Sequence, residues 1–562
     1  MNTEMLNLKC GRTWQAILVS AIVIASAQVG ISQTVSMTTM TGLNTAQPIV
    51  GATATPDPTI GVGTIEFCEH VNSSYQCWYK SGADAFQPVN FIGGTNPKSD
   101  AAIWSQHSNN NGNTSHCPTA DTPNGQILHD NVYDRWILQK RISASNGHSY
   151  MCVAVSNGED MSQPTFGWFA FEYDLDNVIP QNAQGNFLFP DYPQAGLWQT
   201  KSGVKAGSDQ TLWITYDLQD PNNGYNINGV LLCAVDYAGI RASIISPYTN
   251  KSHTPACVVA HPLVPFNQRR SWVPANNSDS IPPISSDGEM FTYAIEPPRD
   301  GKTYLTNATQ TQGVERWTIN WTATPPTPTF VASWNLRATN SGGDEMACFN
   351  PLNYYYTQCI PQPSTATTGI TIDSVGDRMQ QPFSYSSNGG HGSTWTSARA
   401  IQIDPDGIPY GQTEADVRIL QWNTSVPTAI TIMADYRVTD PLDPSAYVFL
   451  PSVARDRAGN IQGILGTSGR GASEHPALGS FNIAAGTSLI STYGYIASPV
   501  TDGDAEDKDP QNYRWGDWFN AVLDPSDSCT VWVVGEYLAT DRTTEPYWYT
   551  EIAQLPPMAG CI

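Results

Sequence analysis

The chain has 562 residues, enough for several small domains or one large repeat fold. Only 14% of its residues are charged, whereas glycine (45), proline (41), tyrosine (25) and tryptophan (17) are abundant. Many turn formers and aromatic residues with few helix-favouring charges predict an all-β protein. The net charge of −23 argues against a nucleic-acid partner, since phosphate binding needs clustered lysine and arginine, and it disfavours attraction to anionic membranes.

The first 27 residues have the features of a secretory signal peptide. Lys9 and Arg12 form a basic start, and the mostly apolar residues 14–25 are too short to span a bilayer comfortably. Ala-Ser-Ala at residues 25–27 fits a cleavage site. An uncleaved anchor is the alternative. No later segment has the length and apolarity of a membrane helix, so we expect no membrane span after cleavage and a secreted protein, extracellular or periplasmic.

Residues 28–55 are rich in Thr, Ala, Ser and Gly and carry no charge, which predicts a flexible leader. We expect the folded domain to occupy residues 56–562. Within it, residues 64–79 alternate as strands do, and residues 127–142 form a strand–turn–strand pattern. Further strands are predicted at residues 150–155, 166–173, 212–216, 230–235, 289–295, 316–321, 378–385, 395–403 and 417–422.

The C-terminal part repeats one pattern most clearly. Residues 448–454 and 461–466 are predicted strands around an Asp456–Asn460 turn. Residues 514–537 again give two strands joined by an Asp-anchored turn, and residues 130–136 are a weaker relative. Short strands, tight turns and units of roughly 40–80 residues predict a sandwich array or a propeller.

The cysteines fit an exported protein. Cys10 lies in the signal, which leaves ten of the eleven cysteines in the mature chain. An even number predicts disulfides, and short loops within one β-unit favour sequential pairing. A zinc site is the weaker alternative, because no CxxC pair is present. The expected pairs are Cys68–Cys77, Cys117–Cys152, Cys233–Cys257, Cys348–Cys359 and Cys529–Cys561.

Five segments, in this order, carry a family resemblance. They are Asp130 with Asp134-Arg135-Trp136, Phe189–Pro193, Gly376–Met379, Pro451–Ile461 and Arg514–Tyr537. With these segments, residues 56–555 resemble a family of secreted bacterial β-propeller proteins that are mostly uncharacterised. The resemblance implies a single propeller of antiparallel strands, and the units counted above suggest about seven blades. Trp518 stands where tyrosine is more usual, and Glu474-His475 where small or hydroxylic residues are common. The resemblance implies no activity.

The closing segment also holds the candidate ligand-binding residues: Asp517, Trp515, Trp518 and Arg514. Aromatic faces suit sugar rings, and a glycosidase needs two carboxylates. Asp524, Asp527 and Glu536 lie in the same segment. The alternative is that the aspartates anchor turns and the tryptophans pack between blades, and this alternative is stronger for Asp524 and Asp527.

The sequence offers weaker candidates for a calcium site and for an arginine-based anion site. Asp502, Asp504 and Asp507 could hold calcium, which prefers oxygen ligands, although their spacing does not match an EF-hand and a solvated acidic loop is the alternative. A sialidase-type site would need converging arginines, for which Arg135, Arg378 and Arg514 are the candidates. His475, beside Glu474, is the histidine that merits the first test.

No G-x-S-x-G, Walker-type, dinucleotide or H-E-x-x-H motif is present, and no catalytic residue is assigned. The sequence therefore favours a secreted, monomeric, non-enzymatic propeller that binds a glycan, a surface polymer or a protein. An extracellular carbohydrate-active hydrolase, sialidase-like or of another propeller type, is the alternative.

Overall fold

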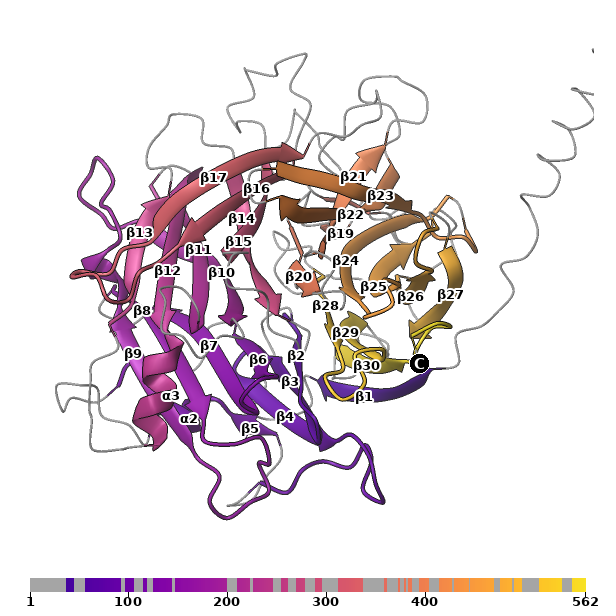
Figure 1. Ribbon diagram of the computed structural model, residues 1–562, viewed down its shortest axis with the longest axis horizontal. Coiled ribbons are helices and arrows are strands. Elements are labelled where there is room, and N and C mark those ends of the chain that lie inside the picture. The colour runs from indigo at the N-terminus through magenta and orange to yellow at the C-terminus, as the bar shows by residue number, and fades with distance from the viewer. Residues whose placement is uncertain are drawn as a thin grey trace, which may run out of the picture.

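Strands form nearly all of the regular structure in the computed structural model of the chain (Figure 1). The structure describes residues 37–44, 56–91, 97–105, 115–118, 125–143, 147–199, 210–222, 226–245, 254–260, 269–277, 289–295, 312–336, 358–360, 372–373, 379–380, 383–386, 394–403, 414–426, 429–443, 445–469, 476–487, 490–497, 515–537 and 548–561. The expected signal peptide at residues 1–27 lies outside these ranges.

The described strands make seven four-stranded blades arranged in a ring around a central axis, called the channel below (Figure 1). Five blades are separate four-stranded sheets, and an eight-stranded sheet supplies the other two, β14–β17 and β20–β23. Within each blade the strands pair antiparallel with their neighbours, in order from the channel outward. The expectation of an all-β protein with a single antiparallel propeller of about seven blades is confirmed.

The first three blades occupy the N-terminal half of the chain. Blade 1 contains β2 (Thr59–Val62), β3 (Glu66–Val71), β4 (Ser74–Tyr79) and β5 (Lys98–Ser99). Blade 2 contains β6 (Gln126–Asp130), β7 (Arg135–Ser143), β8 (Ser149–Ser156) and β9 (Trp168–Asp174). Blade 3 contains β10 (Phe189–Gln199), β11 (Gln210–Asp220), β12 (Asn226–Asp236) and β13 (Ala256–Ala260).

Blades 4 to 6 follow in chain order. Blade 4 contains β14 (Arg269–Asn277), β15 (Glu289–Ile295), β16 (Gln312–Thr318) and β17 (Thr329–Leu336). Blade 5 contains β20 (Phe383–Ser386), β21 (Thr394–Ile403), β22 (Glu414–Val426) and β23 (Ala429–Val438). Blade 6 contains β24 (Tyr447–Arg455), β25 (Ile461–Ser468), β26 (Ala477–Ile483) and β27 (Ile490–Ala497). The small β18 (Gln358–Ile360) and β19 (Ile372–Asp373) pair only with each other.

Among the described residues, three short helical segments accompany the blades: α2 (Ala101–Ser105), the 3-10 turn η1 (Leu175–Asn177) and α3 (Tyr237–Ile245). They follow strands of blades 1, 2 and 3 respectively. No helix among the described residues has the length and apolarity that crossing a membrane requires.

Blade 7 joins the two ends of the chain. Its strands β28 (Asn520–Leu523), β29 (Val531–Tyr537) and β30 (Tyr549–Leu555) are completed by β1 (Thr38–Asn44), which pairs antiparallel with β30. Figure 1 shows indigo β1 beside yellow β30. The expectation of a flexible leader over residues 28–55 is therefore wrong for Thr38–Asn44. The pairing with β30 is made by backbone groups, which every residue carries, so the side-chain pattern of this segment gave no sign of it.

Apolar clusters fill the space between successive blades. One cluster joins blades 1 and 7, where Phe67 stacks on Trp532 at a centroid distance of 4.3 Å. Others join blades 1 and 2, 2 and 3, 3 to 5, 5 and 6, and 6 and 7. Each blade therefore buries both faces, at roughly 25 cal/mol for each Å² of apolar surface removed from water. A blade without a neighbour would expose one of these faces.

Side chains also tie the channel-lining strands of neighbouring blades together. One edge of each of these strands is not hydrogen-bonded to another strand of its own sheet. Buried backbone N–H groups along that edge need other acceptors. Side-chain oxygens of the next blade accept several of them: Asn520 Oδ1 from Ile60 N (3.4 Å), Thr59 Oγ1 from Ile127 N (3.1 Å), Gln126 Oε1 from Ala195 N (2.8 Å) and Asn276 Oδ1 from Leu197 N (3.3 Å). Between blades 4 and 5 a direct parallel pairing of β14 with β20 replaces this device.

Aspartates anchor the first hairpin of several blades. Asp130 accepts hydrogen bonds from two backbone N–H groups of its turn, at 2.9 and 3.1 Å. Asp456 accepts the N–H of Asn460 at 2.8 Å, and Asp524 accepts that of Ser526 at 2.8 Å. The likeness between these segments therefore reflects one repeated turn, and the interpretation of Asp524 as a turn anchor is confirmed.

Four of the five expected disulfides are present: Cys68–Cys77, Cys117–Cys152, Cys233–Cys257 and Cys529–Cys561. Cys348 lies outside the described residues, as does the side chain of Cys359, so their pairing stays a prediction.

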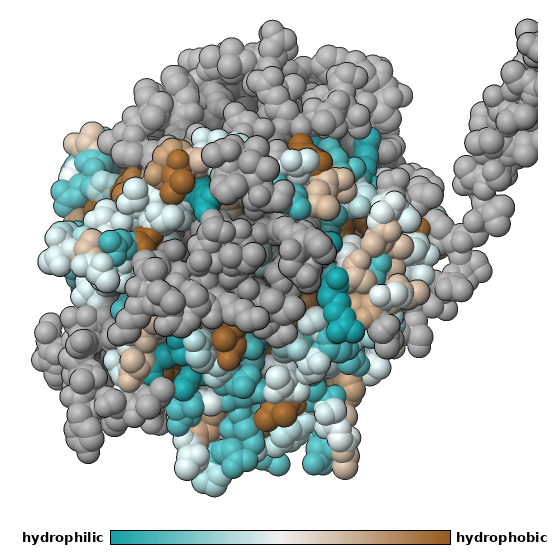
Figure 2. Space-filling model, in the orientation of Figure 1, coloured by the Kyte–Doolittle hydropathy of each residue, from teal (hydrophilic) through white to brown (hydrophobic). Residues whose placement is uncertain are grey.

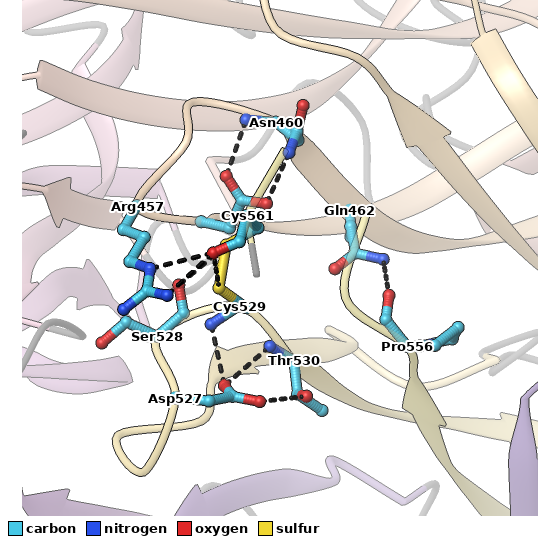
Figure 3. The surroundings of a disulfide bond; sticks show 10 residues. Arg457, Asn460, Gln462, Asp527, Ser528, Cys529, Thr530, Pro556 and Cys561 are labelled. Atoms are coloured by element: carbon cyan, nitrogen blue, oxygen red, sulfur yellow. Dashed lines mark hydrogen bonds between the residues drawn. A yellow bond between two sulfur atoms is a disulfide. The ribbon is translucent and has the colours of Figure 1, made fainter. Parts of the chain in front are cut away.

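The last disulfide holds the C-terminal segment against blades 6 and 7 (Figure 3). Arg457, in the first hairpin of blade 6, donates to the Cys561 carbonyl at 2.8 Å, and Gln462 donates to the Pro556 carbonyl at 2.9 Å. Asp527 accepts from Cys529 N and Thr530 N, which shapes the turn that carries the bridge.

We expect Leu43→Ala to weaken the closure of the ring. Leu43 is fully buried against Val71 and Trp548, and its N–H donates to Glu69 Oε2 at 2.8 Å. The truncation should lower the free energy of unfolding by about 2–5 kcal/mol, the usual range for a buried leucine. Urea denaturation followed by tryptophan fluorescence measures this. Thr38→Ala, on an exposed position of the same strand, is the control and should cost less than about 0.5 kcal/mol. Equal effects of the two substitutions would contradict this account.

Removing Cys529–Cys561 should destabilise the protein more than removing Cys68–Cys77. The bridges join residues 32 and 9 positions apart, and loop-closure entropy predicts losses of about 4 and 3 kcal/mol. The comparison uses the double variants Cys529→Ala/Cys561→Ala and Cys68→Ala/Cys77→Ala in the same denaturation assay. The reverse order of stabilities would refute the proposed anchoring of the C-terminal segment.

Candidate functional site

A shallow recess, with an enclosed volume of only about 20 Å³, lies in the channel at the centre of the ring. Six blades contribute to it through their innermost strands, β2, β6, β10, β14, β20 and β28, or the turn that follows β6. The lining residues are Ile60, Gly61, Val62, Leu128, His129, Asn131, Ala195, Pro274, Asn276, Phe383, Asn520 and Val522. We call this recess the channel pocket.

The channel pocket is apolar with a few neutral polar groups. Three asparagines, Asn131, Asn276 and Asn520, come from three blades, and His129 is the one titratable group among the described lining residues. No carboxylate, lysine or arginine is among those lining residues. Arg135, one of the arginines considered for anion binding, instead donates to the Ser156 carbonyl at 2.8 Å. Arg378 and Arg514 lie outside the described residues.

Three carboxylates gather at one end of the channel, where the innermost strands begin. Asp57 precedes β2, Asp517 precedes β28, and Glu536 lies near the end of β29. Their exposed fractions are only 2%, 5% and 4%. Asp517 N donates to Asp57 Oδ1 at 2.8 Å, which joins blades 7 and 1 at this end. We call these residues the carboxylate cluster.

Glu536 holds its proton more tightly than an ordinary glutamate. Burial raises the pKa of Glu536 well above 4.5, and the negative charges of Asp57 and Asp517 raise it further. A neutral acid beside two aspartates avoids placing three negative charges together in a poorly solvated site. Gly516 makes room for this acid. It has a φ of +96°, and a Cβ there would lie 2.7 Å from Glu536 Oε2.

The tryptophans beside Asp517 pack into the protein. Trp515 and Trp518 are almost completely buried. The Tyr192 ring meets Trp518 edge-on at a centroid distance of 5.0 Å, and the Tyr192 hydroxyl donates to the Asp517 carbonyl at 3.4 Å. Tyr192 belongs to the Phe189–Pro193 segment of blade 3, so two of the family segments meet here. Ligand binding by Asp517, Trp515, Trp518 and Arg514 stays a prediction, since the described side chains are covered.

Asp524 forms a buried ion pair at the opposite end of the channel. Lys80 Nζ lies 2.6 Å from Asp524 Oδ1, and Trp532 Nε1 donates to Asp524 Oδ2 at 2.9 Å. Lys80 also donates to the Gly63 carbonyl and to Ser526. These contacts lock blade 1 to blade 7, which gives Asp524 a structural role.

The other predicted sites fall outside the described residues. They are the calcium candidates Asp502, Asp504 and Asp507 and the Glu474-His475 pair.

Sequence reasoning missed several residues that the fold brings together. Asp57 lies between two prolines at the expected start of the domain, which suggested a boundary and no chemistry. His129 directly precedes the recognised Asp130 motif, and Glu159 lies in an unremarkable loop. The one sequence signal for His129 is the alternation of side chains along β6, which places His129 and Asp130 on opposite faces of the strand.

On the face shown in Figure 2, exposed apolar residues of the described part of the chain lie apart from one another. Monomeric proteins commonly expose apolar residues singly, whereas docking surfaces expose them together. This face therefore offers no apolar docking patch among its described residues.

Comparisons with known proteins add little to this geometry. No protein-family model matches the chain, and no curated protein matches it. Among solved structures, an α-L-arabinofuranosidase from Fusarium graminearum in complex with an iminosugar inhibitor is 8% identical, with 89% of this chain and 98% of that chain covered and a TM-score of 0.30. An α-L-arabinanase from Penicillium chrysogenum complexed with arabinobiose is 9% identical, with 65% and 92% covered and a TM-score of 0.29. At these TM-scores, the propeller assignment rests on the chain's own sheets.

Glu536→Gln should make the free energy of unfolding fall less with rising pH than it does in the wild type. Because the pKa of Glu536 is raised in the folded state, its contribution is fully present below the unfolded value of 4.5 and is lost as pH rises. Glu66 and Glu69, with pKa values raised by burial to about 8 and about 7, act in the same direction. Denaturant unfolding at pH 5, 6, 7 and 8 should therefore give falling stability in the wild type. The variant should fall less, by up to about 1.4 kcal/mol per pH unit.

Asp527→Asn is the control for this experiment. Hydrogen bonds from Thr530 and Cys529 outweigh burial and lower the pKa of Asp527, so this group is already ionised throughout the interval. Its loss should lower stability equally at every pH. An unchanged pH slope in Glu536→Gln would show that Glu536 is ionised in the folded protein.

Proposed function

We propose that this protein is an exported β-propeller that binds the end of a neutral glycan in its channel pocket without cleaving it. The observation that carries the proposal is the lining of the pocket: apolar walls with neutral amides from three blades and no charged residue among the described lining residues. Binding pockets commonly have this composition, apolar walls with a few placed polar groups.

The uncharged lining favours a ligand that needs hydrogen bonds and no counter-charge. Amide groups of Asn131, Asn276 and Asn520 can both donate and accept, as sugar hydroxyls require. Two of these amides are held by structural bonds, Asn276 to Leu197 N and Asn520 to Ile60 N, so their positions are set before a ligand arrives.

The described carboxylates support binding over cleavage. Glycoside hydrolysis needs one carboxylic acid and one carboxylate that both reach the scissile bond. Asp57, Asp517 and Glu536 have exposed fractions of 5% or less, and none of them lines the channel pocket.

A carbohydrate-active hydrolase is the second candidate function. One observation favours it: burial and then the charges of Asp57 and Asp517 raise the pKa of Glu536 well above its ordinary value. A carboxylic acid with a raised pKa is typical of the general acid in glycosidases.

Export is supported by the four described disulfides, which persist in oxidising compartments, and by the secretory features of residues 1–27.

Binding and cleavage can be tested together. The mature protein is screened against a panel of neutral and acidic glycans by array and calorimetry, and released reducing ends are measured in parallel. We expect saturable binding of a neutral glycan and no turnover. Val522→Trp, a half-buried position in the pocket wall, should weaken binding about tenfold or more by filling the space, whereas Val522→Ala should bind as the wild type.

Three results would contradict the proposal: no binding to any neutral glycan, unchanged binding by Val522→Trp, or measurable turnover. If turnover occurs, Asp517→Asn decides the alternative. Loss of turnover with unchanged thermal unfolding would assign Asp517 to the reaction.

A further inference from the structure

A histidine and two carboxylates converge where blades 1 and 2 meet. His129 lies on β6, Asp134 ends the turn between β6 and β7, and Glu159 follows β8. One ligand atom from each lies within 4.8 Å of the other two. This group lies at the end of the channel where the innermost strands enter the first hairpin of each blade. The carboxylate cluster lies at the opposite end. The proposed glycan binding does not use the carboxylates of this group.

His129 is prepared to act as a ligand. Its exposed fraction is 6%, and among the described residues its Nε2 atom has no hydrogen-bond partner. Its Nδ1 lies 2.7 Å from Asn131 Oδ1, so the proton sits on Nδ1 and the lone pair on Nε2. The edge of the ring meets Trp136 at a centroid distance of 4.7 Å, which holds its orientation. Histidines that bind metals commonly have such a partner on the second nitrogen.

Glu159 is held beside this nitrogen. Its Oε1 accepts the Ile65 N–H at 2.7 Å, and its Oε2 accepts the Thr64 hydroxyl at 2.6 Å. Each carboxylate oxygen has two lone pairs, so each keeps one for another partner. Gly63 leaves the space open: a Cβ there would overlap Glu159 Oε1 and lie 2.9 Å from His129 Nε2.

Neither Asp134 nor Glu159 forms an ion pair among the described contacts, and the nearby cations have other partners. Lys80 pairs with Asp524, and Arg135 donates to the Ser156 carbonyl. A divalent cation bound between the two carboxylates would balance their negative charges.

A second histidine–carboxylate group is arranged differently. His148, Asp174 and Asp176 also lie close together, but His148 Nδ1 contacts Asp176 Oδ2 directly at 2.7 Å. In that group the histidine nitrogen already lies against a carboxylate, whereas His129 Nε2 has no hydrogen-bond partner among the described residues.

We propose that His129 Nε2, Asp134 and Glu159 form a binding site for a divalent transition-metal ion of the zinc type, with solvent completing the coordination. Zinc takes imidazole and carboxylate ligands, commonly three from the protein and one water. Imidazole disfavours calcium and magnesium, which prefer all-oxygen sites. In a tetrahedral site with zinc bonds of about 2.0–2.2 Å, ligand atoms lie about 3.3–3.6 Å apart, so the three side chains must draw closer together when the ion binds. A metal here would tie the first hairpin of blade 1 to blade 2.

The test is calorimetric titration of the mature, chelator-treated protein with ZnCl₂, and with CaCl₂ for comparison. We expect one equivalent of Zn²⁺ to bind, more tightly than Ca²⁺, and to raise the melting temperature. Asp134→Asn and His129→Gln should each weaken Zn²⁺ binding about tenfold or more. His148→Gln, in the second group, is the matched control and should bind as the wild type.

Asp134→Asn guards against a folding artefact. Asp134 is exposed and has a φ of +52°, a conformation that asparagine adopts readily, so this variant should fold even if His129→Gln does not. The proposal is overturned if no saturable Zn²⁺ binding occurs, if Ca²⁺ binds more tightly than Zn²⁺, or if Asp134→Asn keeps wild-type affinity.

Discussion

The pairing of β1 with β30 is the contact on which the rest of the architecture depends. Each blade is apolar on both faces and is stable only between two neighbours, so seven blades must form a closed ring. Closure requires residues from the two ends of the chain to share one sheet. β1 supplies the outer strand of blade 7, while Leu43 and Glu69 connect that strand to blade 1.

Closure also determines what the channel can offer to a ligand. The innermost strands face the channel with an unpaired edge, and side-chain oxygens from neighbouring blades accept some of those N–H groups. Asn276 and Asn520 therefore serve the ring and line the channel pocket at the same time. The described lining of this recess therefore contains no carboxylate, lysine or arginine, although the chain as a whole carries a net charge of −23.

The negative charge of buried acidic groups is compensated in different ways at the two ends of the channel. At the end where the innermost strands begin, Glu536 is buried with Asp57 and Asp517, and its raised pKa favours the neutral acid, which would relieve the repulsion. At the hairpin end, Lys80 neutralises Asp524, whereas Asp134 and Glu159 lie beside an open imidazole nitrogen. Protonation, an ion pair and a proposed metal ion are three solutions to one problem, because isolated charges are costly away from water.

The sequence by itself determined the local features: the all-β class, strands such as residues 150–155, the Asp-anchored turns and four of the disulfide pairs. These depend on residues near one another in the chain, where alternation, turn chemistry and short loops act directly. Only the tertiary structure decided that Thr38–Asn44 is a strand, that Trp515 and Trp518 are covered, and that His129 meets Glu159. Those outcomes depend on which blades become neighbours when the ring closes, and no spacing along the chain encodes that contact.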